Sequence, residues 1–336
     1  MTSALPRRKP LSARVLAKVP YAAAAYLVAV GAFCFAIWTA DANPLTTLAL
    51  FGPRWVVALP LLVFAPLAVF ARSYWAGVLT VVAGVVVAGP ITGGTASIGP
   101  IFTSDRPALA RIRVVSWNMG GVKAGPAFRQ FVEQTEPTIV ACQESGLTAD
   151  QMPKGWTVLG ERGNTVATRS PIRFDAFLEF PSLGVGGRLD RYIIDTPDGE
   201  LTLVDAHLPT ARPGIETAIG TKFRDLSELR HIIAIRAEAS RTARAWVGRA
   251  DANVIVVGDF NMPVESRIYR EDWSDFRNAF SEAGNGWGTT KQTSWFGIRI
   301  DHVLYTQPWR CRKAWIGPGM GSDHRPLVAD LVLEDG

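Results

Sequence analysis

The sequence has few of the side chains that build disulfide frameworks and zinc sites. Only three cysteines occur in 336 residues, Cys34, Cys142 and Cys311, and their spacing matches no zinc-binding pattern. Cys142 falls in an expected buried strand, where cysteine packs as a small apolar residue. A Cys142–Cys311 disulfide in an oxidising compartment is the alternative. The sequence therefore gives no support to a zinc site.

The globular part of the chain also lacks an excess of positive charge. The net charge of +5 comes from the N-terminal region, because residues 1–72 hold seven Lys and Arg and one acid. The other 28 basic and 29 acidic residues give residues 73–336 a net charge of −1. A domain that binds DNA tightly without sequence preference carries its positive excess on the binding surface. The distribution therefore argues against such a domain.

Long apolar runs are abundant, and they lie near the N-terminus. Three of them match the roughly 20 residues that a bilayer core requires: Tyr21–Ala40, Trp55–Ala71 and Trp75–Ile91. Pro60 and Pro66 interrupt the second run, but membrane helices tolerate proline because neighbouring helices satisfy the freed backbone groups. Buried core helices are the alternative. Three runs with very short connections favour three transmembrane helices.

Basic residues predict the orientation of these spans, since cytoplasmic segments are rich in Lys and Arg. Five of them precede the first span: Arg7, Arg8, Lys9, Arg14 and Lys18. A cytoplasmic N-terminus and three crossings place the C-terminal domain outside the cell membrane. A cleaved signal peptide is the alternative for the first span, because Ala40-Asp41-Ala42 resembles a cleavage site. Two crossings would then remain, and the C-terminal domain would still be extracytoplasmic.

The chain divides into four expected regions. These are a basic cytoplasmic N-terminus (1–20), a three-helix membrane anchor (21–91), a linker rich in Gly, Ser, Thr and Pro (92–110), and a globular domain (111–336). In the globular domain, apolar runs of strand length alternate with helical segments. The pattern predicts an α/β fold in which two helical layers enclose two packed sheets.

The periodicity places two helices and eleven strands in this domain. The helices are expected at Pro126–Thr135 and from about Leu226 to Val247. The strands are expected at 111–116, 138–143, 156–159, 164–169, 172–180, 190–196, 201–207, 253–258, 300–305, 311–316 and 326–333.

Acidic and amide side chains follow several of the expected strands. Asn118, Glu144, Asp259 and Asn261 each come directly after an apolar run. A carboxylate at the end of a buried strand is costly unless it is paired or bound to a metal, and Mg²⁺ prefers oxygen ligands. Turn or surface residues are the alternative for each one alone. As a set they predict a cation site for Mg²⁺, with Mn²⁺ or Ca²⁺ as alternatives.

Histidine is scarce, and its placement is informative. Three of the four histidines, His207, His302 and His324, lie at strand edges beside acids. An imidazole can accept or donate a proton near neutral pH. Asp301 can orient such a ring by accepting its second N–H. His302 is expected on the opposite face of its strand, so no chemistry is assigned to it.

Six motifs occur in fixed order: SWNMG (116–120), QES (143–145), DAHLP (205–209), GDFNMP (258–263), RIDHVLYT (299–306) and SDHRPLV (322–328). This ordered set resembles the endonuclease/exonuclease/phosphatase superfamily, which includes deoxyribonuclease-I-like nucleases, apurinic endonucleases, neutral sphingomyelinases and inositol polyphosphate 5-phosphatases. Within it, the chain is similar to a membrane-anchored bacterial type. The resemblance covers residues 111–333 and implies a four-layer α/β/β/α sandwich.

The resemblance also implies the metal ligands and substrate contacts. Glu144 would be the principal Mg²⁺ ligand, with Asn118 and Asp323 nearby. Arg188 or Arg191 would contact phosphate, and Asn164 would line the site.

The same resemblance implies the catalytic residues. Asp259 and Asn261 would position the water and the phosphate. Asp301 would orient His324, which would act as general base or would position the water. His207 would stabilise the transition state or act as general acid.

The expected function is that of a membrane-anchored, outward-facing, metal-dependent phosphoesterase that hydrolyses phosphodiester or phosphomonoester bonds. Nucleic acid and phospholipid head groups are the expected substrates. The bilayer is the expected partner, and no obligate protein partner is evident. A catalytically silent ligand-binding module on a membrane stem is the alternative. A transporter or sensor with an enzyme appended is disfavoured because the three runs contain no buried charge.

Overall fold

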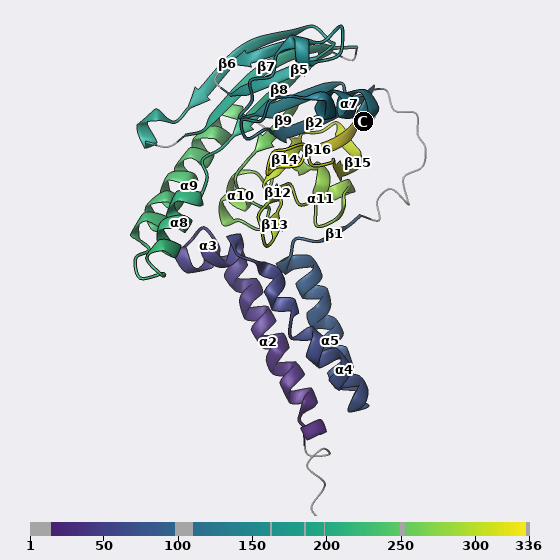
Figure 1. Ribbon diagram of the computed structural model, residues 1–336, viewed down its shortest axis with the longest axis vertical. Helices are drawn as coiled ribbons and strands as arrows, with labels where there is room; N and C mark the ends of the chain where they lie inside the picture. The colour runs from purple at the N-terminus through teal and green to yellow at the C-terminus, as the bar shows by residue number, and fades with distance from the viewer. Residues whose placement is uncertain are drawn as a thin grey trace, which may run out of the picture.

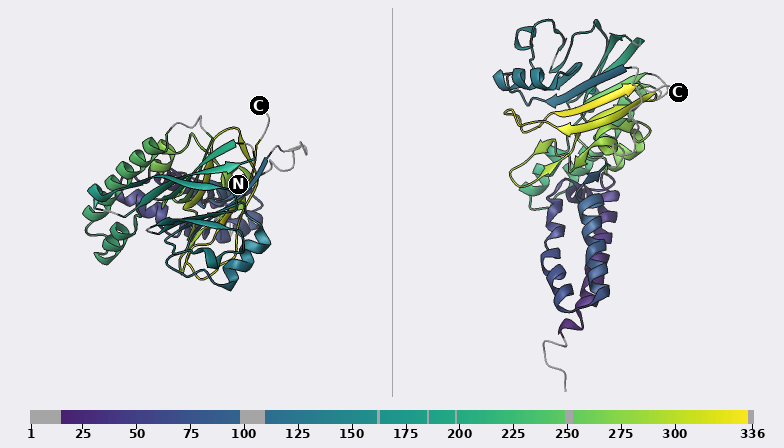
Figure 2. Two further views of the ribbon diagram at one scale, coloured as in Figure 1. Left: turned by 90° about the horizontal axis from the view of Figure 1, so that it is seen from above. Right: turned by 90° about the vertical axis from the view of Figure 1, so that its right-hand side faces the viewer.

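An apolar helical bundle and an α/β domain make up the chain (Figure 1). The structure, a computed structural model, describes residues 15–97, 110–161, 163–184, 186–197, 199–248 and 253–333. Most of the expected linker and most of the basic N-terminus lie outside the described residues. Figure 2 shows the bundle extending from one end of the α/β domain.

Most helices of the bundle run side by side, and α3 (Pro44–Phe51) lies across their end, beneath the domain (Figure 1). Its elements in chain order are α2 (Val19–Trp38), α3 (Pro44–Phe51), the 3₁₀ helix η1 (Arg54–Ala58), α4 (Leu61–Phe70), α5 (Tyr74–Val86) and the π-helical turn η2 (Val87–Ile91).

Two segments, Val19–Trp38 and Tyr74–Ile91, are long and apolar enough to cross a membrane. The pair formed by Pro44–Phe51 and Arg54–Phe70 is bent by 82°, and it gives a third span only if it is counted as one. This bend lies between Phe51 and Arg54, before the expected second span, and that span itself consists of the 3₁₀ helix η1 followed by α4. Its helix breaks around Pro60, which has no N–H to donate to the preceding turn.

Two six-stranded sheets form the centre of the α/β domain. The first has the order β15 (Trp309–Ile316), β16 (Leu327–Leu333), β2 (Ala110–Asn118), β3 (Ile139–Gln143), β5 (Asn164–Thr168), β4 (Thr157–Glu161). The second has the order β10 (Arg277–Asn278), β14 (Asp301–Tyr305), β9 (Val254–Asp259), β8 (Gly199–His207), β7 (Arg188–Thr196), β6 (Ile172–Glu179). All eleven expected strands are present, with bounds shifted by a few residues.

Short elements complete the domain. Two small ladders pair β1 (Thr95–Ala96) with β11 (Asn285–Gly286) and β12 (Lys291–Gln292) with β13 (Gly297–Ile298). The helices are α7 (Pro126–Thr135), α8 (Arg212–Gly220), α9 (Ser227–Val247), α10 (Arg267–Asp272) and α11 (Ala279–Ala283), with 3₁₀ turns η3 (Ala149–Gln151) and η4 (Pro181–Leu183). The bounds of α7 agree with the expected helix.

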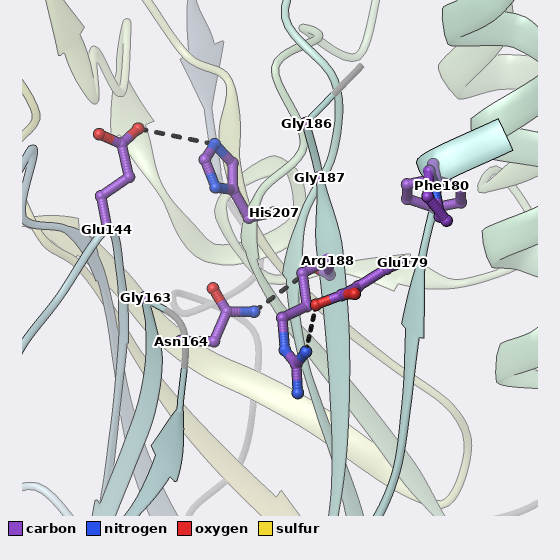
Figure 3. Close-up of a pocket in the computed structure, with 10 residues that line it drawn as sticks. Glu144, Gly163, Asn164, Glu179, Phe180, Gly186, Gly187, Arg188 and His207 are labelled. Carbon is purple, nitrogen blue, oxygen red and sulfur yellow. Dashed lines mark hydrogen bonds and ion pairs between the residues drawn. The ribbon is translucent and has the colours of Figure 1, made fainter. Parts of the chain in front are cut away.

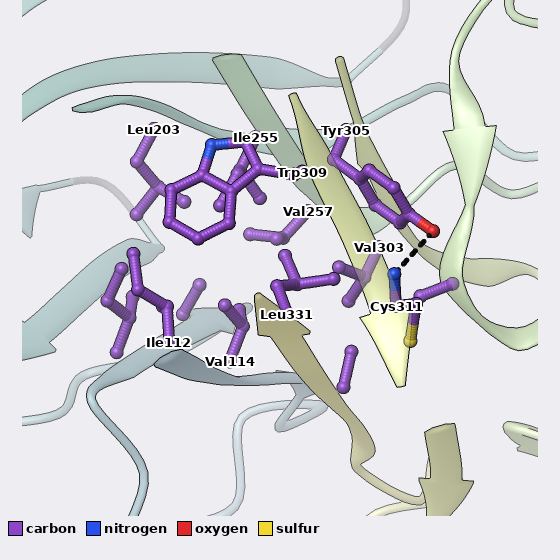
Figure 4. Close-up of a cluster of buried hydrophobic side chains, with 14 of the residues drawn as sticks. Ile112, Val114, Leu203, Ile255, Val257, Val303, Tyr305, Trp309, Cys311 and Leu331 are labelled. Carbon is purple, nitrogen blue, oxygen red and sulfur yellow. Dashed lines mark hydrogen bonds between the residues drawn. The ribbon is translucent and has the colours of Figure 1, made fainter. Parts of the chain in front are cut away.

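The two sheets pack face to face through alternating apolar side chains. Ile112 and Val114 of one sheet share a buried cluster with Leu203, Ile255 and Val257 of the other (Figure 4). Burial of each such side chain contributes about 1.5–3 kcal/mol. This core agrees with the expected sandwich.

The outer faces of the sheets pack against helices, because side chains along a strand alternate between its two faces. Val115 and Trp117 of β2 cluster with Phe128 of α7. On the other sheet, Val204 and Val256 cluster with residues of α9. Cys34, Cys142 and Cys311 are all free, so the alternative disulfide does not form.

Candidate active site

Two pairs of parallel strands explain why distant motifs meet. β2 and β3 are parallel, with Asn118 opposite Gln143, and β8 and β9 are parallel, with His207 opposite Asp259. Parallel strands end at the same edge of a sheet, so each pair delivers its polar residues side by side. Asp301 opens the antiparallel strand β14 directly opposite Asp259. The topology therefore gathers residues from separate motifs at one edge of the sandwich.

Asn118 is buried and joins two carboxylates. Its Nδ2 donates to Oε1 of Glu144 at 3.0 Å and to Oδ2 of Asp259 at 2.9 Å. Its Oδ1 accepts the N–H of Gly120 at 2.9 Å. The backbone of Glu144 has a φ of 47°, a region that residues other than glycine rarely adopt. The Glu144 side chain is 48% exposed, so its carboxylate oxygens are accessible at the surface while its backbone is held in one conformation.

The ring of His324 lies between two buried acids. Its Nδ1 is 2.9 Å from Oδ2 and 3.2 Å from Oδ1 of Asp301, and its Nε2 is 3.7 Å from Oδ2 of Asp259. Burial by itself lowers the pKa of His324, but the Asp301 and Asp259 carboxylates outweigh it and raise that pKa to about 9. The ring therefore carries both protons at neutral pH.

Asp259 and Asn261 form a tight turn after β9. Oδ1 of Asp259 accepts the N–H of Asn261 at 2.8 Å. Burial, and then the neighbouring Asp301, raise the pKa of Asp259. Nδ2 of Asn261 donates to the carbonyl of Leu208 at 2.8 Å, so one N–H of this amide fixes the adjacent DAHLP loop.

His207 and Glu144 line a pocket of about 450 Å³. Nε2 of His207 is 3.6 Å from Oε1 of Glu144 (Figure 3). Asn164, Phe180 and Arg188 are also in its wall. A pocket of this size can accept the group attached to a reacting phosphate.

Two of the expected substrate contacts are already bonded within this wall. Arg188 is buried and forms an ion pair with Glu179 at 2.5 Å (Figure 3). It forms a second ion pair with Asp190 at 2.6 Å. Nδ2 of Asn164 donates to the carbonyls of Arg188 and Asp205, at 3.4 and 3.3 Å. Both residues line the pocket, and the two ion pairs neutralise the guanidinium charge of Arg188.

The structure does not bring Arg191 to this edge. Its guanidinium forms an ion pair with Asp175 at 2.6 Å and lies 4.5 Å from the ring centroid of Trp246 in α9. Arg191 is three residues beyond Arg188 on the same strand, and an odd spacing places side chains on opposite faces. Arg191 therefore faces the helical layer.

Lys291 is a site residue that the sequence analysis missed. It forms an ion pair with Asp323, and its backbone forms an isolated antiparallel β-bridge with that of His324. Burial alone would raise the pKa of Asp323, but the hydrogen bond and charge of Lys291 lower it. A lone lysine in a polar stretch shows no distinguishing pattern, and only the short β12–β13 hairpin brings it here.

A buried polar pair beneath the site was also missed. Nε2 of Gln143 donates to Oδ1 of Asp205 at 2.5 Å. Burial raises the pKa of Asp205 well above its usual range. Gln143 and Asp205 belong to the QES and DAHLP motifs, and this membership was the signal in the sequence that could have identified them as site residues.

His302 lies where its strand position predicted, away from the cleft. Its Nε2 is 2.9 Å from the carbonyl of Met262, and its ring packs against Phe260 and Tyr269. Burial lowers its pKa to about 4. The ring is a neutral part of the core.

The donor set at this edge fits a hard divalent cation. Among the described residues, four carboxylates contact three basic side chains here: Glu144, Asp259, Asp301 and Asp323 contact His207, His324 and Lys291. Oxygen donors with excess negative charge suit Mg²⁺ or Ca²⁺.

One buried trio, Asp259, Asp301 and His324, has ligand atoms that all lie within 4.8 Å of one another. Both oxygens of Asp301, however, already face Nδ1 of His324. The partly exposed Glu144, beside Asn118, is therefore the better ligand.

One family profile matches the chain. The profile described as Endonuclease/Exonuclease/phosphatase family matches residues 115–324, a range that includes the site residues from Asn118 to His324. A search of curated proteins found no match.

Solved structures with a similar chain path include an endonuclease/exonuclease/phosphatase from Beutenbergia cavernae, at 15% identity and TM-score 0.49, covering 66% of this chain and 72% of that one. A family protein from Bacteroides thetaiotaomicron has 17% identity and TM-score 0.48, covering 67% and 98%. A mannosyl-6-phosphatase from the same organism has 18% identity and TM-score 0.45, covering 66% and 100%.

Proposed function

The chain belongs to the endonuclease/exonuclease/phosphatase family, and from this premise we propose that it is a membrane-anchored phosphoesterase that depends on a divalent cation. The observation that carries the proposal is the convergence of Glu144, Asn118, Asp259 and the Asp301–His324 pair at one sheet edge. These groups come from separate motifs and are linked by hydrogen bonds. Their convergence also disfavours a catalytically silent module.

Glu144 is the main protein ligand in this proposal, with the Asn118 amide and the Asp323 carboxylate beside it. When bound, a divalent cation offsets the negative charge of the phosphate and polarises a phosphoryl oxygen. Asn118 holds Glu144 and Asp259 at a fixed separation, because its Nδ2 bonds to both carboxylates. The ligand set is thereby oriented before substrate binds.

The two histidines and Asp259 handle charge and protons. Asp301 accepts Nδ1–H of His324, so the ring is fixed with Nε2–H directed toward Asp259 and the cleft. Because His324 is protonated at neutral pH, it suits donation to a phosphoryl oxygen better than proton abstraction. Asp259, whose Oδ2 lies 3.7 Å from Nε2 of that ring, is the better acceptor for the proton of the attacking water. His207, across the cleft, is placed to donate to the leaving oxygen.

Membrane anchoring is supported by the surface of the bundle. Val28, Leu62 and Val69 have exposed fractions of 72, 74 and 75%, which is costly in water and favourable in lipid. Lys18 and Arg72 lie beside the helix ends farthest from the domain (Figure 1). The positive-inside rule then places that end in the cytoplasm and the site on the opposite side of the membrane.

The substrate in this proposal is a phosphodiester or phosphomonoester in a nucleic acid or a phospholipid head group. The pocket beside Glu144 and His207 accepts the rest of the substrate molecule.

Hydrolysis by the full-length chain in detergent tests the proposal. We expect cleavage of bis-p-nitrophenyl phosphate with Mg²⁺ or Mn²⁺, loss with EDTA, and recovery when metal is restored. Glu144→Gln should lower kcat/KM by about 10²-fold or more, whereas Asp195→Asn, an exposed change on β7, should not. Plasmid DNA, RNA, phospholipid vesicles and sugar phosphates then identify the substrate class. Full activity in EDTA, or in Glu144→Gln, would exclude the proposed role of the metal.

A further inference from the structure

A buried acid lies where the helical bundle meets the domain. Asp41, between α2 and α3, has a side chain that is 0% exposed. Its carboxylate accepts from Nη1 of Arg236 at 2.6 Å and from Oγ of Ser266 at 2.5 Å. Its own N–H donates to Oγ1 of Thr47 at 2.9 Å. An ion taken out of water is tolerated only when it is paired in this way.

Arg236 of α9 connects Asp41 to two loops of the candidate site. Its side chain is 1% exposed. Besides the bond to Asp41, Nη2 donates to the carbonyl of Asn261 at 2.9 Å and Nε donates to the carbonyl of Pro209 at 3.3 Å. The guanidinium is a rigid planar fork, so one side chain can fix three groups in relation to each other.

Both carbonyls are close to catalytic groups along the chain. Pro209 is two residues beyond His207, and Asn261 is two residues beyond Asp259. The loops are also joined directly, because the N–H of Leu208 donates to the carbonyl of Asp259 at 2.9 Å and Nδ2 of Asn261 donates to the carbonyl of Leu208 at 2.8 Å. Among the described residues, Arg236 is therefore a side chain that connects both loops to the bundle.

Removal of Asp41 would leave Arg236 as an unpaired buried charge. A guanidinium cannot lose its proton in a protein, so it would have to move toward water or draw water inward. Either movement weakens its bonds to the Pro209 and Asn261 carbonyls. The positions of His207 and Asp259 would change as a result.

We propose that the membrane anchor helps to position the catalytic residues. Asp41 of the anchor holds Arg236 in place, and Arg236 acts as a positioning residue that supports both catalytic loops. The catalytic consequence rests on the proposed function. The pairing also requires that Asp41 stay attached to the domain, and cleavage at Ala40-Asp41-Ala42 would not leave the junction intact. The proposal therefore requires that the first apolar helix is retained in the working protein.

Kinetics of the full-length chain in detergent test the proposal, with bis-p-nitrophenyl phosphate and Mn²⁺ at a temperature well below unfolding. Asp41→Asn and Arg236→Gln should each lower kcat on the order of 10²-fold, the effect of about 1 Å of misplacement, with KM little changed. The double variant Asp41→Leu/Arg236→Met should recover thermal stability, because an apolar pair can replace a buried ion pair. Its kcat should stay low, since the fork is absent.

Arg54→Gln is the matched control for anchor docking. Arg54 of η1 is also buried and pairs with Glu265 of the domain at 3.4 Å, but no described bond links it to the two catalytic loops. It should lower the melting temperature and leave kcat unchanged. An Asp41→Asn variant with normal kcat, or a Leu/Met double variant with restored kcat, would overturn the proposal.

Hydrogen–deuterium exchange separates this inference from the proposed function. In Asp41→Asn, the amides of Leu208 and Asn261 should exchange faster, while those of the central strand β2 should not change. If no form of the chain hydrolyses any phosphoester, the proposed function fails, and the exchange result still decides the positioning role. Unchanged exchange at both loops, or equal acceleration throughout the domain, would contradict it.

Discussion

Replacement of Asp301 by asparagine isolates the charge that holds the His324 ring protonated. The Oδ1 of asparagine can still accept the Nδ1–H that Asp301 accepts at 2.9 Å, so ring orientation is kept while one negative charge is removed. In the native chain the two neighbouring carboxylates raise the pKa of His324 to about 9. Without Asp301 this pKa should fall toward the ordinary value of about 6.5.

The expected loss of activity follows from the protonated fraction of the ring. At pH 8 an imidazole with a pKa of about 9 is about 90% protonated, and one with a pKa of about 6.5 is about 3% protonated. If the charged ring is the active form, Asp301→Asn should be about 30-fold slower than wild type at pH 8. At pH 6 both rings are mostly protonated, and the two activities should differ by less than about twofold.

The assay is kcat/KM for bis-p-nitrophenyl phosphate from pH 5.5 to 9 at fixed Mn²⁺, with the full-length chain. Wild-type activity should persist up to about pH 9, and the variant should decline as pH rises through about 6.5 to 7. Asp195→Asn, at the opposite end of β7 from Arg188, is the matched control and should follow the wild-type profile. A deficit of the same size at every pH would refute the reasoning, because it would show that the charge of His324 does not limit the rate.

Three further outcomes are expected. Acid should destabilise the fold through His302, because its pKa of about 4 lies below its unfolded value. The free energy of unfolding should fall by roughly 3 kcal/mol as pH drops from 6.5 toward 4. His302→Gln should make the free energy of unfolding less dependent on pH, as measured by urea unfolding at pH 4.5 to 7. Arg191→Ala should leave kcat/KM within about twofold of wild type and cost about 1 kcal/mol or less, since the pair with Asp175 lies on the far face; a large kinetic loss would restore Arg191 to the site. A reporter fused after Gly336 should be active only when it is outside the cytoplasm, and activity confined to the cytoplasm would reverse the orientation.

Sequence patterns predicted most of the α/β domain because its strands are short apolar runs between turn residues. The amphipathic segment Pro126–Thr135 forms the expected helix with the expected bounds. The second apolar run was less predictable, since Pro60 divides it into a 3₁₀ helix and an α-helix. Hydropathy measures length and composition, and it does not register such a break.

The candidate site was predictable where residues lie at the ends of parallel strands. Asn118, Glu144, His207 and Asp259 follow apolar runs, and parallel pairing brings those ends together. Arg188 or Arg191 was expected to contact phosphate, and the expected strand began at residue 190. In the structure β7 already begins at Arg188, so the three-residue spacing places the two side chains on opposite faces.

The remaining site residues depend on contacts between distant segments. Lys291 reaches Asp323 only because a two-residue ladder folds back beside the final strand. Asp41 and Arg236 are 195 positions apart, and each looks unremarkable in its own segment. No local periodicity encodes which buried acid meets which buried base, so such pairs appear only when the topology is known.

The most direct test of the central claim is to locate the cation itself. Crystals of the full-length chain with Mn²⁺ should give an anomalous peak about 2.0–2.6 Å from a carboxylate oxygen of Glu144, with the His324–Asp301 hydrogen bond still formed. Absence of density at Glu144, or a peak seated between Asp259, Asp301 and His324 that breaks this bond, would contradict the account.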